Sequence, residues 1–174
     1  MTSPAIGDPA PNFDLTSTED CLLMLRDEVA RTAVLLYFFP ILDDRARADL
    51  TALAARHGEL LRRDTRVLAI SRVKLADLKA VQRELRLPFP LLHDDRNFSA
   101  HYGVEAAAEG VEGAPALYVV ASGERIAWAA NPVAAVAEAL PEVESLVKDL
   151  PPDTAGYPRS VINRLVDRWV HLRG

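Results

Sequence analysis

The chain has 174 residues and a net charge of −5, and 49% of its residues are hydrophobic. This composition is typical of a globular protein, and its acidic balance gives no support for nucleic-acid binding. No apolar run approaches the roughly 20 residues that span a bilayer, and the stretch Met1–Gly7 lacks the features of a secretory signal. The single cysteine cannot form an internal disulfide, so we expect a cytoplasmic protein without nucleic-acid or membrane partners.

Apolar runs and amphipathic segments alternate through the first half of the chain. Arg31–Phe39 and Thr65–Ile70 are short and rich in β-branched or aromatic residues, which is typical of buried strands. Between them, Asp43–Arg63 carries apolar residues at helical spacing and starts with aspartates suited to an N-cap. Lys74–Arg86 has the pattern of a second amphipathic helix, which Pro88 ends.

The second half of the chain predicts further strands and a long helix. The expected elements are a strand at Phe89–Leu92, a brief helix at Asp95–Tyr102, a hairpin of Pro115–Val120 and Arg125–Ala129 around Ser122-Gly123, and a helix from Asn131-Pro132 to about Asp149. This order indicates an α/β fold with a mixed sheet flanked by helices. We expect one domain over residues 1–150 and a C-terminal helical extension over residues 151–174.

Three stretches resemble the peroxiredoxins of the AhpC/TSA superfamily. Gly7–Leu15 (GDPAPNFDL) is similar to their N-terminal pattern Gly-Asp-x-Ala-Pro-x-Phe-x-Leu, and Val34–Pro40 is similar to the strand before their active site. Leu87–Asp94, followed by Tyr102–Val104, resembles the bacterioferritin-comigratory branch. The resemblance covers about residues 7–149 and implies a thioredoxin-like fold with an N-terminal β-hairpin extension.

The resemblance also implies an active-site motif, Pro-x-x-x-Thr-x-x-Cys, supported by a distant arginine. Pro40 matches the proline, but counting from it places Asp44 at the threonine position and Arg47 at the cysteine position. Counting back from Gly123 places Ala114 at the arginine position. Peroxide reduction needs a thiolate, and a guanidinium that stays protonated cannot replace it as a nucleophile. The motif is therefore expected to be catalytically degenerate.

The stretch around Pro115 is similar to the loop of thioredoxin that carries a proline beside the active site. That resemblance implies a cis Ala114-Pro115 bond and backbone groups available to a partner peptide. We therefore treat Pro115 as a candidate binding residue.

Two features near the motif allow more than one interpretation. Arg45 and Arg47 either point into solvent beside acidic neighbours or, with Asp44 and the free N–H groups of a helix start, bind an anion. Cys21 is expected to be a small, partly buried hydrophobic residue, and a peroxidatic role for it is the alternative.

No metal or cofactor site is expected. The acidic pairs Asp43-Asp44 and Asp94-Asp95 are interpreted as helix caps, since neither lies in a loop with calcium-ligand spacing. The four histidines lack zinc-motif spacing and are His57, His93, His101 and His171.

The segment Pro158–Arg173 has an amphipathic pattern with arginines on its polar face. It is expected to pack on its own domain or on a second subunit of a homodimer, and a membrane surface is the remaining alternative.

Three functions remain open. The first is a degenerate peroxiredoxin-like protein that keeps its fold for binding or regulation and is not an enzyme. The second is an active thiol-dependent peroxidase that uses Cys21. The third is an anion- or peptide-binding module built on Arg45, Arg47 and Pro115.

Overall fold

A computed structural model describes residues 3–104, 113–121 and 123–150 of the chain. The elements in chain order are β1 (Asp14–Ser17), β2 (Leu22–Met24), α1 (Leu25–Val29), β3 (Ala33–Phe38), α2 (Asp44–Arg62), β4 (Thr65–Ser71), α3 (Leu75–Glu84), β5 (Leu91–His93), the 3₁₀ helix η1 (Phe98–Tyr102), β6 (Ala116–Ala121), β7 (Arg125–Ala130) and α4 (Val136–Asp149). The expected C-terminal helix and the extension at residues 151–174 lie outside the described residues.

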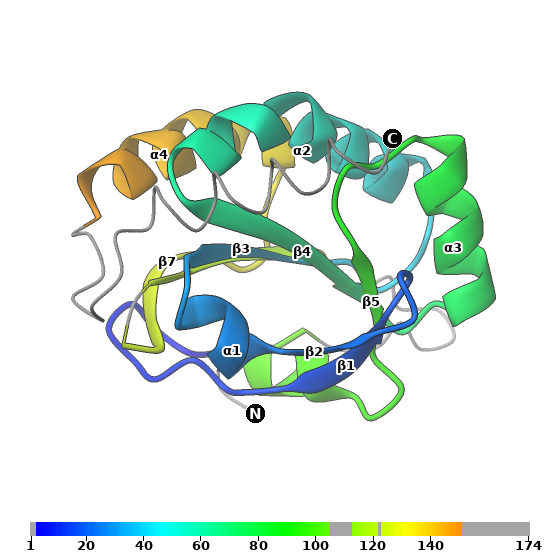
Figure 1. Cartoon of the computed structure of the whole chain (residues 1–174), viewed down its shortest axis with the longest axis horizontal. Helices are drawn as coiled ribbons and strands as arrows, with labels where there is room; N and C mark the ends of the chain where they lie inside the picture. Colours follow the sequence, from blue (N-terminus) through cyan, green and yellow to red (C-terminus); the bar gives the residue numbers. More distant parts are fainter. Residues whose placement is uncertain (1–2, 105–112, 122, 151–174) are drawn as a thin grey trace, which may run out of the picture.

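The strands form one seven-stranded mixed sheet in the order β2-β1-β5-β4-β3-β6-β7. Strands β3, β4 and β5 run parallel to one another. Strand β1 pairs antiparallel with β2 in one hairpin, and β6 pairs antiparallel with β7 in another. Helices α2 and α4 lie side by side over one face of the sheet, with α3 beside them, and α1 lies on the opposite face (Figure 1). The mixed sheet, its flanking helices and the N-terminal hairpin confirm the predicted architecture.

The central strand β3 is buried along its whole length. Its alternate side chains serve two cores: Leu35 and Tyr37 face α2, α3 and α4, while Leu36 and Phe38 face α1 and η1. A strand covered by helices on both faces has no solvent side, which explains its unbroken apolar sequence.

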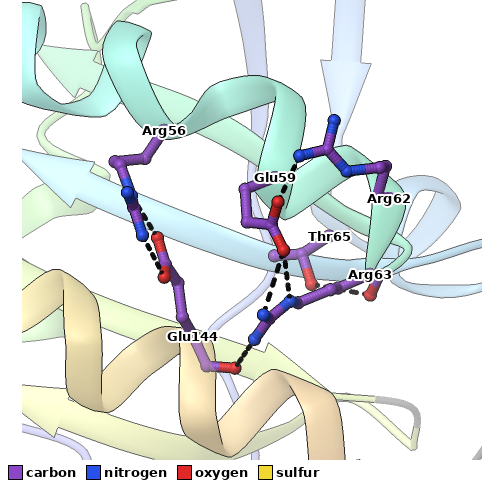
Figure 2. Close-up of polar contacts among 6 residues, drawn as sticks. All are labelled: Arg56, Glu59, Arg62, Arg63, Thr65 and Glu144. Carbon is purple, nitrogen blue, oxygen red and sulfur yellow. Dashed lines mark hydrogen bonds and ion pairs between the residues drawn. The ribbon is translucent and has the colours of Figure 1, made fainter.

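Helices α2 and α4 are joined by charged side chains as well as by their apolar faces. Arg56 on α2 donates two hydrogen bonds to the buried carboxylate of Glu144 on α4, and Arg63 donates to the backbone carbonyl of Glu144 (Figure 2). Hydrogen bonds from Arg62 and Arg63 lower the pKa of Glu59, and those to Glu144 raise the pKa of Arg56. These contacts hold α4 against α2.

The start of α4 differs from the prediction. The sequence predicts a helix from Asn131-Pro132, but α4 begins at Val136. The backbone N–H of Val133 donates to the carbonyl of Pro115 at 2.9 Å, so this stretch is held against the approach to β6 instead of entering a helix.

The brief helix predicted at Asp95–Tyr102 is the 3₁₀ helix η1, which starts at Phe98. The buried carboxylate of Asp94 accepts the backbone N–H groups of Phe98 at 2.8 Å and Ser99 at 2.9 Å. Asp94 thus satisfies the first backbone N–H groups of η1, as expected of a capping carboxylate, although Asn97 holds the N-cap position.

Helix α3 ends in a left-handed residue that is not glycine. Arg86 has φ +50°. The N–H of Arg86 donates to the carbonyl of Arg83, and the N–H of Leu87 donates to the carbonyl of Gln82. These two bonds form a Schellman motif, in which glycine is the preferred residue at the position of Arg86.

We predict that Arg86→Gly raises the free energy of unfolding by about 0.5–1 kcal/mol, because glycine adopts positive φ without steric cost. Urea denaturation followed by circular dichroism measures the change. The matched control is Arg83→Gly, inside the same helix, which should lower stability by about 1 kcal/mol. Equal effects of the two substitutions would contradict the role of the left-handed position.

Candidate functional site

A cavity of about 60 Å³ lies where the chain passes from β3 into α2. Its walls come from the end of β3, the first turn of α2 and the segment before β6, through Tyr37, Phe39, Pro40, Ile41, Asp43, Arg45, Ala46, Gly113 and Pro115. The cavity therefore lies beside the stretch that the sequence singles out.

The first turn of α2 is built on an aspartate cap. Asp43 has an extended backbone, and its carboxylate accepts the N–H of Ala46 at 2.7 Å. The side chain of Ala46 is 1% exposed and reaches both the cavity and the core. Asp43 and Ala46, three residues apart, thus both line the cavity. The capping role predicted for Asp43-Asp44 is confirmed for Asp43.

Counting from Pro40 assigned Asp44 and Arg47 to the motif, but neither residue lines the cavity. Asp44 is exposed and is not part of the cavity wall. Arg47 forms an ion pair with Glu84 on α3, with Nη1 and Oε1 2.8 Å apart. Counting from Pro40 therefore identifies the right turn of the helix, but the neighbours Asp43 and Ala46 face the cavity. Asp43 is recognisable in the sequence as an N-cap residue of α2. The N-cap position was therefore the signal that could have identified Asp43 and, three residues later, Ala46.

The segment before β6 supplies the opposite wall. Pro115 is buried and lines the cavity together with Gly113, whereas Ala114 is exposed. The prediction of a cis Ala114-Pro115 bond is wrong: within the described residues the cis bond is Asn131-Pro132. The carbonyl of Pro115 is occupied by the N–H of Val133, and a bond within the protein thus satisfies one of the groups expected to serve a partner peptide.

The guanidinium of Arg45 has partners within the protein, so neither interpretation of Arg45, free in solvent or bound to an anion, matches its contacts. Its guanidinium donates to the carbonyl oxygens of Val133 and Ala134, the latter at 2.8 Å, and its Nε lies 4.0 Å from a carboxylate oxygen of Asp49. Arg47 is likewise paired, with Glu84. Both arginines already have acidic or carbonyl partners, so the arrangement lends no support to the anion-binding interpretation, which stays a prediction.

The buried carboxylate of Asp49 binds the hydroxyl of Tyr37, a residue that lines the cavity. Asp49, 5% exposed, accepts the hydroxyl of Tyr37 at 2.9 Å and the backbone N–H of Val136 at 3.1 Å. Burial and the adjacent charge of Asp49 raise the pKa of Tyr37 far above its usual value. This network of Asp49, Tyr37, Arg45 and Val136 was not predicted, because it joins β3, α2 and the start of α4, and Val136 lies 87 residues from Asp49.

Cys21 is exposed, contrary to the expectation of partial burial. It lies in the turn between β1 and β2, where its Sγ is 3.1 Å from the hydroxyl oxygen of Ser17. Strands β1, β5 and β4 separate β2 from β3 in the sheet. The only thiol of the chain is therefore remote from the cavity.

Within the described part of the chain, no group of three or more His, Cys, Asp or Glu side chains could hold a metal ion. The Nδ1 of His93 is 2.9 Å from the carbonyl oxygen of Val73, so this ring has a structural contact. No helix among these same residues is long and apolar enough to cross a membrane.

A model of the AhpC/TSA family matches residues 6–129. The chain belongs to this family. The match extends over the hairpin, the central sheet and the cavity, in agreement with the resemblance of the sequence motifs. A comparison with curated protein sequences found no match.

Solved structures of peroxiredoxins share the fold. Peroxidoxin BcpB from Mycobacterium tuberculosis superposes with a TM-score of 0.77 at 14% identity, covering 85% of this chain and 99% of that one. A cysteine-to-serine variant of PrxQ from Xylella fastidiosa gives 0.72 at 18% identity, with 83% and 98% covered. Peroxiredoxin Q from Xanthomonas campestris gives 0.70 at 17% identity, with 78% and 89% covered. The likeness confirms the thioredoxin-like fold of this AhpC/TSA protein.

The cavity geometry predicts a difference between two introduced thiols. In a Cys21→Ser background, Arg47→Cys should react with a soluble aromatic disulfide about tenfold faster than Ala46→Cys, because buried thiols react slowly. Arg47 has a side chain that is 35% exposed, whereas Ala46 is 1% exposed. The release of the coloured thiol measures both rates. Equal rates would show that position 46 is not buried as the structure has it.

The buried Tyr37 predicts a loss of stability in alkali. Its raised pKa means that, above about pH 10, the unfolded chain releases this proton while the folded chain keeps it. Stability is therefore fully present below pH 10 and falls as the pH rises further. Tyr37→Phe should reduce the slope by about 1.4 kcal/mol per pH unit. Urea denaturation between pH 9 and 11 measures the slopes, and identical slopes would contradict the assignment.

Proposed function

We propose that this AhpC/TSA protein does not reduce peroxides and that its fold serves binding or regulation. The observation that carries the proposal is that none of the described residues lining the cavity carries a thiol, including the buried Ala46 of the first α2 turn. We further propose that Asp43 and Ala46, which have the Thr-x-x-Cys spacing, occupy the positions of the threonine and the cysteine of the family motif.

The chemistry supports this interpretation. When a thiolate reduces a peroxide, a sulfur–oxygen bond forms, the oxygen–oxygen bond breaks, and the sulfur supplies the electron pair. Among the described residues of the cavity wall, no side chain can supply that pair in the same way: Ala46 has no heteroatom, and Arg45 is a cation held by carbonyl oxygens. The carboxylate of Asp43 would in addition oppose an anionic nucleophile beside it.

The remaining features fit a structural or binding role. The polar groups around the cavity are engaged with one another, through Asp49 to Tyr37 and through Arg45 to the loop before α4. We propose that the protein acts in the cytoplasm, without a cofactor, through contacts with another protein.

The decisive experiment is a peroxidase assay with hydrogen peroxide and an organic hydroperoxide, with dithiothreitol as the thiol donor. Wild type and Cys21→Ser should both consume peroxide at the rate of the buffer and thiol alone, because neither has a thiol at the cavity.

Cys21→Ser separates the two alternatives. Turnover by wild type that disappears in Cys21→Ser would replace the proposal with a peroxidase that uses Cys21. Turnover that persists in Cys21→Ser would also overturn it, since that variant contains no thiol. Circular dichroism of both proteins checks that the folds are equal.

A further inference from the structure

The two edges of the sheet differ in how they are covered. At one edge, the N-terminal segment pairs with β7: the N–H of Gly7 donates to the carbonyl of Ile126 at 2.8 Å, and the N–H of Ala10 donates to the carbonyl of Glu124 at 2.7 Å. The other edge is β2. Nothing comparable pairs with β2 within the part of the chain that the structure describes. An uncovered edge strand presents backbone groups to a partner strand.

The register of the hairpin shows which groups β2 presents. Leu23 lies opposite Leu15, and the flanking pairs are bonded through Ser17 N–H to the Cys21 carbonyl and Leu25 N–H to the Phe13 carbonyl. Bonded pairs alternate with non-bonded pairs in an antiparallel ladder. It follows that Leu22 and Met24 direct their backbone N–H and C=O groups away from β1.

The side chains of these two residues are apolar and exposed. The exposed large hydrophobic residues among the described ones are Ile6 at 65%, Leu22 at 57% and Met24 at 41%. Two of the three therefore lie on this short edge strand, on the same face of the sheet. Edge strands are ordinarily protected by charged side chains, which β2 lacks.

We propose that β2 pairs with β2 of a second copy of this chain, antiparallel about a two-fold axis at Leu23. In this register, Leu22 lies opposite Met24 of the second copy. The Met24 N–H donates to the Leu22 carbonyl across the interface, and symmetry repeats this bond. The two exposed apolar side chains then meet as cross-strand neighbours.

Charge at the two ends of β2 favours a second copy as the occupant. Antiparallel pairing brings the end of β2 that follows Asp20 close to the end of β2 on the second copy that leads into Arg26 on α1, and the two-fold axis repeats this at the other end. The side chains of Asp20 and Arg26 are 73% and 66% exposed, so their present partners Lys79 and Glu124 leave them accessible. An isologous interface needs this kind of self-complementarity.

The test uses the full-length chain and measures its mass by sedimentation equilibrium over a concentration series. Wild type should rise from one chain to two with concentration. Met24→Lys and Leu22→Lys should each stay monomeric, because they place like charges along the shared edge. The matched control is Ile6→Lys, which adds the same charge at another exposed apolar position and should dimerise like wild type.

A charge exchange tests the register. Arg26→Asp should weaken the dimer by about tenfold, and Asp20→Arg combined with Arg26→Asp should restore it, because antiparallel pairing brings the acidic end of one β2 to the basic end of the other. Failure to restore would overturn the register.

Two results would overturn the interface itself. One is a monomeric wild type at every concentration, as expected if residues 151–174 cover β2 within the same chain. The other is a Met24→Lys dimer as stable as wild type. Circular dichroism of each variant confirms that the fold is kept.

Discussion

The carboxylate of Asp49 is buried where β3, α2 and the start of α4 meet, and the candidate site depends on it. It accepts the Tyr37 hydroxyl and the N–H of Val136, and it lies near the Arg45 guanidinium. A buried carboxylate is tolerated only when hydrogen bonds and opposite charge compensate for its lost hydration. Each of these partners is therefore held in one position, and the wall of the cavity is fixed with them.

This constraint also links the site to the packing of the helices. The ion pair between Arg56 and Glu144 joins α4 to α2 (Figure 2). At the start of α4, the N–H of Val136 donates to Asp49. The loop before α4 then offers its carbonyl oxygens to Arg45. The side chain of Arg45, which was a candidate for binding a ligand, thus stabilises the fold instead. The family fold is present, and fold alone does not establish peroxidase activity.

Much of the fold could be predicted from the sequence. The strand of Arg31–Phe39 and the helix of Asp43–Arg63 were expected close to their observed bounds, because a doubly buried strand and a capped amphipathic helix have local signatures. The site was harder to predict. The helix start at Val136 depends on contacts between distant segments, such as the bond from the Val136 N–H to Asp49.

The sequence by itself determined the family, the order of the elements and the absence of a cysteine after Pro40. Only the tertiary structure decided which residues of the α2 turn face the cavity and where the two arginines lie. The physical reason is that the side chains of Ala46 and Arg47 point about 100° apart around the helix. The packing of α2 on the sheet, and not the count from a motif, sets which of them is buried.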